Sequence, residues 1–493
     1  MTILSNPSRM AGDDERFLRW TMLALLAVTS IRLAWLQFGR LDLYPDEAQY
    51  WLWSLTPDWG YYSKPPLLAW IIRLTTALCG DSETGVRLAS PLLHCAASVI
   101  VYRIARLLYD VRIACWSAIA YATLPGISFS SLIISTDVPL LLCWAAALYA
   151  FLCALEASSW RWWIAVGIAA GLGLLAKYAM AYWLLSALLF LLIAKEERRH
   201  LPRFFAAAAL ALAIYSPNFF WNAAHGYVSY HHTEANANID GFALHPGAFG
   251  EFAGSQFGVF GPIFFAALLV IVVFWPRSLA ERRAQILAVF ALPTLAMMLA
   301  VSLLSRAHPN WSAPAYVSAT ILVVAFLIER GRVVLVAASV ALHVAAAILL
   351  IETRDIAQAA GWNMPGQYDP VHRLRGWAAL ARGVDTLRLQ DPGAKILSDN
   401  REVLASLIYY LRPHPFDALK WNPGHGVHDQ FDLSADIKDH IGEDVIFVSP
   451  RSQPVDVPSY FAETGSIGHV VVPLGGNTTR EFLLMELNGF KGY

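Results

Sequence analysis

Long apolar runs alternate with short polar connections over the first 352 residues of this 493-residue chain. A run of about 20 apolar residues is long enough to cross a bilayer as an α-helix. About eleven such runs can be placed, at residues 18–38, 87–108, 113–131, 138–156, 161–177, 179–194, 204–220, 258–275, 285–304, 313–328 and 333–352. The pattern predicts a polytopic α-helical membrane protein, with a break between two nearly continuous runs at Lys177 and Tyr178.

Basic residues are concentrated in every second connection. The rich connections contain Arg103–Arg112, Arg161, Lys195–Arg203, Arg277–Arg283 and Arg330–Arg332, and the poor ones contain Lys64, Arg73, Lys177 and Arg306. Cytoplasmic connections carry more Lys and Arg than external ones. We therefore expect a cytoplasmic N-terminus, with the connections at 39–86, 132–137, 221–257 and 305–312 on the outer, periplasmic side of a bacterial inner membrane.

The pattern changes near residue 353, where charged residues, Pro and Gly become more frequent. Short strand-like runs occur at 394–399, 444–450 and 469–474, and 401–412 has the spacing of an amphipathic helix. The expected organisation is a transmembrane catalytic domain over 1–352, with an active-site loop at 39–86, and a small periplasmic α/β domain over 353–493.

Composition supports a membrane protein: 57% of residues are hydrophobic and only 15% are charged. The net charge of −1 and the lack of a basic run argue against a nucleic-acid partner. The five cysteines do not pair at metal-ligand spacing. The expected partners are the bilayer and its lipids, and the expected oligomeric state is a monomer.

The first outer connection holds an acidic pair, Asp46 and Glu47, among many aromatic residues. Trp and Tyr favour the membrane–water interface, so this loop should form short amphipathic helices on the membrane surface. Two solvated loop carboxylates are the alternative interpretation of the pair. A partly desolvated carboxylate suits a general base, and we predict a catalytic role for Asp46 and Glu47.

Lys64 lies in the same loop, directly before Pro65 and Pro66. A snorkelling lysine is the simple explanation. The prolines, however, favour the first turn of a helix, and free N–H groups at a helix start attract phosphate. We predict that Lys64 binds a phosphate.

The other outer connections add further candidates. They are Asp137, Lys177, Tyr178, Arg306, His308 and Asn310. A helix N-cap would explain Asp137, and ion pairing or interfacial anchoring would explain Lys177 and Arg306. The side of the membrane that they share with Asp46 and Lys64 favours a joint active site, in which Lys177 and Arg306 help to hold a phosphate.

His231, His232 and Glu234 lie close together in the outer connection at 221–257. Imidazole and carboxylate groups bind metal ions, but this spacing is not diagnostic. A divalent cation is therefore retained as a candidate here, while the reaction is expected to require no cofactor.

These motifs together resemble the GT-C superfamily of polyprenyl-phosphate-dependent glycosyltransferases. The similarity is to the branch with the lipid A aminoarabinose transferase, the rhizobial lipopolysaccharide-core galacturonosyltransferases and the protein O-mannosyltransferases. The matching pieces are YPDEAQY (44–50), YYSKPPL (61–67), TDVPL (136–140) and HPNW (308–311), and more loosely DNR (399–401) and YY (409–410). The order of these pieces matches over roughly the first 350 residues.

The resemblance implies an inverting transfer of a sugar from a polyprenyl-phosphate carrier to a periplasmic lipid or glycan acceptor. Asp46 would be the catalytic carboxylate, Lys64 would hold the carrier phosphate, and Asp137 would lie across the cavity. The expected substrate contacts are Tyr61, Tyr62, Tyr178, His308 and Asn310. In the aminoarabinose transferase a Glu that helps to bind zinc precedes the lysine, and here that position is Ser63.

The sequence leaves two other functions open. A protein O-glycosyltransferase of the same superfamily would share these motifs. A lipid or sugar transporter, or a flippase, would also need charges near the membrane, but no inverted repeat is visible and the charges gather on one side.

Overall fold

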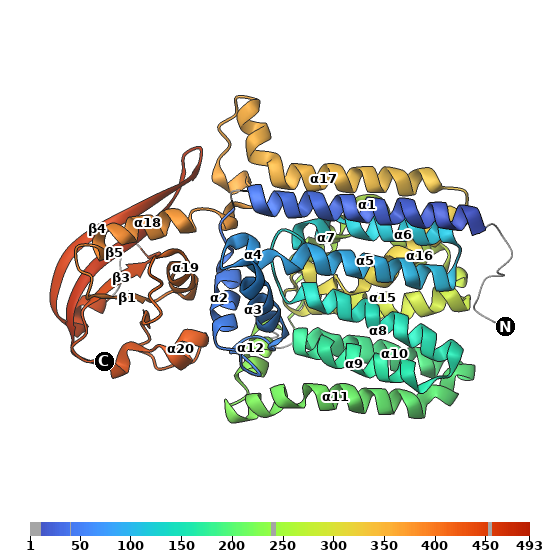
Figure 1. The fold of residues 1–493 in the computed structure, drawn as a ribbon, viewed down its shortest axis with the longest axis horizontal. Helices are drawn as coiled ribbons and strands as arrows, with labels where there is room; N and C mark the ends of the chain where they lie inside the picture. Colours follow the sequence, from blue (N-terminus) through green and yellow to red (C-terminus); the bar gives the residue numbers. More distant parts are fainter. Residues whose placement is uncertain (1–10, 40, 238–242, 452–455) are drawn as a thin grey trace. The chain divides into compact units, whose positions relative to one another are not determined.

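A computed structural model describes residues 11–39, 41–237, 243–451 and 456–493. The expected cytoplasmic start (1–10) and the middle of the outer connection at 221–257 (238–242) lie outside the described residues. The chain forms two compact units. The first consists of Met1–Phe38, Lys64–Ile71 and Arg87–Ala347, and the second of Gly39–Ser63, Ile72–Val86 and Ile348–Tyr493 (Figure 1).

The first unit is a bundle of apolar helices. Its helices are α1 (Ala11–Phe38), α5 (Ala89–Leu108), α6 (Val111–Thr123), α7 (Pro125–Ser130), α8 (Asp137–Ala157), α9 (Trp160–Ala176), α10 (Ala181–Ile193), α11 (Leu201–Ala224), α12 (Val228–Ala237), α13 (Pro246–Val259), α14 (Pro262–Phe274), α15 (Arg282–Leu304), α16 (Ala315–Glu329) and α17 (Val333–Ala359), whose end enters the second unit. Every predicted apolar run contains a helix, which confirms the expected helical membrane fold.

The number of membrane spans is a separate question. Among the described residues, six helices are long and apolar enough to cross a membrane, and a pair bent by 118°, α13 with α14, would make a seventh. Several of the remaining runs form shorter apolar helices, α9 and α16 among them. Eleven spans therefore stay a prediction.

Breaks between helices follow local sequence signals. Lys177 is extended (φ −160°, ψ 136°), which confirms the predicted break after α9. The single run predicted over 113–131 is wrong, because Leu124 leaves the helical region before Pro125 and starts a second helix, α7. The run predicted from 258 likewise begins only at Pro262, after Gly261 turns the chain with φ +89°.

Aromatic packing and close helix contacts hold the bundle together. The rings of Trp183 and Phe290 lie 5.2 Å apart in a fully buried cluster with Phe151. Gly171 lets α9 approach α11, because a Cβ there would lie 2.7 Å from Ile214. Small residues at such crossings are typical of membrane helices.

The second unit is built on a five-stranded sheet. Its elements are α2 (Pro45–Leu55), α18 (Trp377–Arg388), β1 (Lys395–Ser398), α19 (Arg401–Tyr410), β2 (Leu419–Lys420), α20 (Gln430–Ser434), β3 (Val445–Ser449), β4 (Phe461–Gly475) and β5 (Thr478–Phe490). The helices α3 (Leu67–Cys79) and α4 (Glu83–Arg87) each have one end in the first unit. The strand order is β2-β1-β3-β5-β4, with β1 parallel to β2 and β3 and β5 antiparallel to its neighbours.

The expected α/β domain and the amphipathic helices of the first outer loop are confirmed. Within the second unit, segments of that loop bond to the C-terminal part of the chain. Asp42 Oδ2 accepts a bond from Trp377 N at 2.8 Å, and Leu43 N donates to Tyr410 Oη at 2.6 Å. The compact unit thus includes 39–63 and 72–86, while 1–352 and 353–493 stay our proposal for the domain boundaries.

Candidate active site

Asp137 is the centre of a polar cluster in the first unit. It begins α8, and its carboxylate accepts a bond from Lys177 Nζ on Oδ1 at 2.6 Å and from Asn310 Nδ2 on Oδ2 at 2.7 Å. The Asp137 side chain is 9% exposed and that of Lys177 is 20% exposed. Three residues singled out from the sequence therefore meet, and Lys177 has its charge compensated by Asp137.

The other basic candidates of this unit differ in exposure. Lys64 is half-buried and lies just ahead of α3, whose first turn is closed by a bond from Trp70 N to Pro66 O at 3.2 Å. Arg306 and His308 are exposed in the connection after α15. The Pro65-Pro66 step thus starts a helix as predicted, and Lys64 stands before it.

Tyr178 belongs to a second polar group that sequence reasoning missed. Its hydroxyl donates to Asn218 Oδ1 at 3.2 Å and accepts a bond from Asn222 Nδ2 at 3.4 Å. The rings of Tyr215 and Tyr230 also lie beside Tyr178. Asn218 and Asn222 are four residues apart in α11, a spacing that places both on one helix face and that could have indicated this site.

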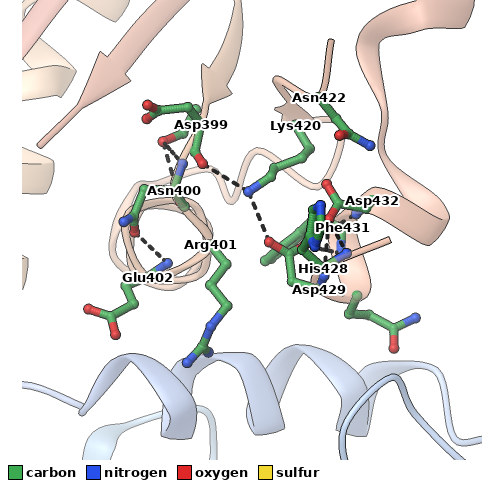
Figure 2. Close-up of polar contacts among 12 residues, drawn as sticks. Asp399, Asn400, Arg401, Glu402, Lys420, Asn422, His428, Asp429, Phe431 and Asp432 are labelled. Atoms are coloured by element: carbon green, nitrogen blue, oxygen red, sulfur yellow. Dashed lines mark hydrogen bonds and ion pairs between the residues drawn. The ribbon is translucent and has the colours of Figure 1, made fainter. Parts of the chain in front are cut away.

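Asp46 stands in the first turn of α2, within the second unit. Its Oδ1 accepts a bond from Arg401 Nη1 at 2.8 Å, and the same nitrogen donates to Gln49 Oε1 at 2.9 Å. Figure 2 shows Arg401 extending from the start of α19 toward α2. The Asp46 side chain is 33% exposed. Among the described residues Oδ2 of Asp46 has no hydrogen-bond partner, so one carboxylate oxygen is available to a substrate.

The environment of Arg401 is governed by this contact. Burial lowers the pKa of Arg401, whereas the charge of Asp46 and its hydrogen bond raise it. The two effects of Asp46 outweigh burial, so the pKa of Arg401 is raised overall. Arg401 is thus a fixed cation that orients Asp46. Sequence reasoning connected Arg401 to the family only loosely, and the partner of Asp46 could not be found without the fold.

Glu47, the neighbour of Asp46, has a different environment. It is 1% exposed, and its Oε2 accepts a bond from Tyr44 N at 2.8 Å as part of a capping box at the start of α2. Capping satisfies backbone N–H groups that the helix itself leaves unpaired. The buried position of Glu47 favours a structural role over the predicted catalytic one.

Tyr61 and Tyr62 also separate in the structure. Tyr61 is 4% exposed, its ring stacks on Trp53 at 4.6 Å, and its hydroxyl donates to Trp53 O at 3.0 Å. Burial raises the pKa of Tyr61 to about 12. Such a side chain has little surface for a substrate. Tyr62 is half-buried, and its N–H donates to Gln430 Oε1 at 2.8 Å.

Lys420 connects the two segments that contact the first outer loop. Its Nζ donates to Asp399 O at 3.0 Å and to Asp429 Oδ2 at 2.9 Å, as Figure 2 shows. Asp399 leads into α19, which carries Arg401, and Asp429 caps α20, which carries Gln430. This buried lysine therefore fixes the two loop-contacting helices relative to each other within the second unit.

The candidate metal site at His231, His232 and Glu234 is not formed. His231 Nδ1 and Glu234 Oε2 are 3.7 Å apart on exposed faces of α12, whereas His232 Nε2 contacts Asn236. Adjacent residues of a helix point about 100° apart, so the imidazoles of His231 and His232 do not point toward the same metal ion. No group of three His, Cys, Asp or Glu side chains suited to a metal occurs within 11–39, 41–237, 243–451 and 456–493.

Comparison with known proteins finds related glycosyltransferases. A family model described as dolichyl-phosphate-mannose-protein mannosyltransferase matches residues 63–221. The chain is 32% identical over 392 residues to the lipid A galacturonosyltransferase RgtD of Rhizobium johnstonii, which covers 79% of this chain and 82% of that protein. Over 173 residues, 31% of each chain, it is 31% identical to undecaprenyl phosphate-alpha-4-amino-4-deoxy-L-arabinose arabinosyl transferase 1 of Pseudomonas fluorescens.

The fold has a close counterpart among solved structures. The crystal structure of ArnT from Cupriavidus metallidurans in the apo state aligns with a TM-score of 0.64 at 15% identity. The alignment covers 95% of this chain and 98% of that one, so membrane bundle and C-terminal sheet both correspond. The chain therefore belongs to the GT-C superfamily of polyprenyl-phosphate-dependent glycosyltransferases, in the branch of the lipid A and lipopolysaccharide-core galacturonosyltransferases, and it is a membrane glycosyltransferase.

Proposed function

We propose that this enzyme transfers galacturonic acid from a polyprenyl-phosphate carrier to lipid A at the periplasmic side of a bacterial inner membrane. The sugar and the acceptor are taken from RgtD, the relative that covers most of the chain. The carrier class follows from the family. The outer location rests on the alternation of basic residues between connections. The enzyme acts as a monomer.

The observation that carries the proposal is Oδ2 of Asp46, which has no hydrogen-bond partner among the described residues. Arg401 holds Oδ1, while Oδ2 can accept the proton of an acceptor hydroxyl. As the hydroxyl oxygen of the acceptor bonds to the anomeric carbon, the bond from that carbon to the carrier phosphate breaks. The polyprenyl phosphate leaves with the electron pair of that bond. Direct displacement of this kind inverts the configuration of the anomeric carbon.

The basic residues of the first unit divide between two roles. Lys64, before the start of α3, stabilises the leaving phosphate, and exposed Arg306 assists it. Lys177 is already neutralised by Asp137, so it shapes the site together with Asn310 instead of binding phosphate. Tyr62, Tyr178 and His308 supply the remaining substrate contacts.

A transfer assay tests the function. The purified chain in detergent is given undecaprenyl-phosphate-linked galacturonic acid and lipid A, and the product is analysed by mass spectrometry. Addition of one galacturonosyl group is expected without any ion gradient, which a transporter would need. No transfer to lipid A would overturn the acceptor assignment, and no use of the lipid-linked donor with any acceptor would overturn the proposal.

A protein acceptor is the second candidate. The family model that matches residues 63–221 is described by transfer of mannose to proteins. Mass spectrometry of envelope proteins and lipopolysaccharide from a deletion strain separates the two: loss of a uronic acid from lipid A is expected, whereas loss of sugars only from proteins would favour the second candidate.

A further inference from the structure

A cavity of about 270 Å³ lies within the second unit, apart from the contacts described above. Its wall includes Tyr44, Arg373, Trp377, Asn400, Glu402 and Arg480. The volume is just below the usual range for small-molecule sites, which suits a group of the size of one sugar ring.

Positive charge exceeds negative charge in this cavity. Arg373 Nη2 lies 3.6 Å from Glu402 Oε1, a loose ion pair in which the Arg373 side chain is 57% exposed. Arg480 makes no ion pair with any of the described residues, and its Nη1 is covered without a hydrogen-bond partner. Two guanidinium groups therefore face one carboxylate, and a covered donor without a partner is costly. An anion in the cavity would offset that surplus.

Both guanidinium groups are held by aromatic rings. Arg480 Cζ lies 4.8 Å from the ring centre of Trp377, and Arg373 Cζ lies 4.7 Å from that of Tyr44. Trp377 is itself fixed by a bond from Nε1 to Arg373 O at 2.9 Å. Stacking occupies the face of a guanidinium and leaves its N–H edge for a planar anion such as a carboxylate, or for a phosphate.

The cavity is next to the proposed catalytic pair along the chain. Tyr44 precedes Asp46 by two residues, and Asn400 directly precedes Arg401. Asn400 accepts bonds from Glu402 N and Val403 N, so the same cap that starts α19 also shapes the wall of the cavity. A ligand here would lie beside the residues that position Asp46.

We propose that this cavity binds an acidic sugar of the transfer reaction, through the carboxylate or phosphate that the sugar carries. The inference rests on the proposed function for the identity of the ligand as a substrate. The carboxylate would come from a uronic acid donor, and the phosphate from a phosphorylated acceptor. Arg373 and Arg480 bind the anion, and the rings of Tyr44 and Trp377 keep the two arginines in place.

Equilibrium binding to the full chain in detergent tests the site. The probes are galacturonic acid, glucose 6-phosphate, neutral glucose and inorganic phosphate. At least one acidic sugar should bind about 10-fold or more tightly than glucose, and Arg480→Gln and Arg373→Gln should each weaken it about 10- to 100-fold. Arg382→Gln, at an exposed arginine of α18 outside the cavity, should not change binding.

The outcomes separate the alternatives. A preference for galacturonic acid assigns the cavity to the donor, and a preference for glucose 6-phosphate assigns it to the acceptor. Equal binding of glucose and both acidic sugars, or equal binding by all three variants, would overturn the proposal. Inorganic phosphate binding as tightly as glucose 6-phosphate would overturn a sugar site. If Arg480→Gln fails to fold, the exposed Arg373 carries the test alone.

The binding measurement does not depend on the proposed transfer activity, so the two can fail separately. Binding that survives while no transfer is detected would refute the proposed function and leave the cavity as an acidic-sugar site. Transfer that proceeds normally in Arg373→Gln and Arg480→Gln, without any probe binding, would refute the cavity alone.

Discussion

Replacing Lys177 by Met should destabilise the membrane unit, because it leaves the Asp137 carboxylate without its cation. Asp137 is 9% exposed at the side chain, so water cannot replace the lost partner fully. Removing one partner of a buried ion pair costs about 3–5 kcal/mol. Asn310 still donates to Oδ2, and Lys177 itself is one-fifth exposed, which lowers the expected cost to about 2–4 kcal/mol.

A double variant separates charge from packing. Lys177→Met combined with Asp137→Asn removes both charges, so it should be more stable than Lys177→Met alone, by about 1–2 kcal/mol. Lys195→Met is the matched control, since Lys195 is exposed and forms no ion pair with a carboxylate in the described part of the chain.

Thermal unfolding of the purified protein in detergent, followed by tryptophan fluorescence at one heating rate, gives the order of the variants. Unfolding of a membrane protein of this size can be irreversible, so the order matters more than the absolute midpoint. The expected order of stability is Lys195→Met, then the double variant, then Lys177→Met. A Lys177→Met protein as stable as the control, or a double variant less stable than Lys177→Met, would refute a stabilising Asp137–Lys177 pair.

Three further predictions follow from the same arrangement. Lys64→Ala should reduce transition-state stabilisation by about 2–4 kcal/mol, the scale for one charged stabiliser, and this is measured as a fall in kcat/KM for the lipid-linked donor. Unchanged donor kinetics would exclude Lys64 from phosphate binding. Chelation of the purified enzyme should leave activity unchanged, because His231, His232 and Glu234 do not converge on one point; loss that a divalent ion restores would contradict this. Reporter fusions after Arg199 and after Gly393 should report opposite sides of the membrane, and the same side for both would refute the orientation.

The helical fold could be predicted because each apolar run is long and its ends carry local signals. The break at Lys177 is one example of such a signal. The strands at 394–399 and 444–450 could be predicted in turn from their short apolar runs. β5 was missed, because the four consecutive residues Phe482–Met485 are all buried, which interrupts the alternation typical of a strand. α7 was missed because an apolar run does not show that Leu124 must leave the helix before Pro125.

The candidate site divides in the same way. Asp137, Lys177 and Asn310 could be proposed because each lies in a short outer connection, and the structure brings them together. The Asp46–Arg401 contact joins residues 355 positions apart, and no local pattern carries such information. Glu47 could not be told from Asp46 by sequence, since the two are adjacent in one helix, where Glu47 is buried and the Asp46 side chain is 33% exposed.

The most direct test of the account is the rate of sugar transfer by Asp46→Asn. This change keeps the size of the side chain and removes the base, so turnover should fall by at least about 10²-fold. Asp58→Asn, at an exposed aspartate of the same loop, serves as the control and should transfer at a near-normal rate. A folded Asp46→Asn protein with the turnover of the control would contradict the assignment of Asp46 as the catalytic base.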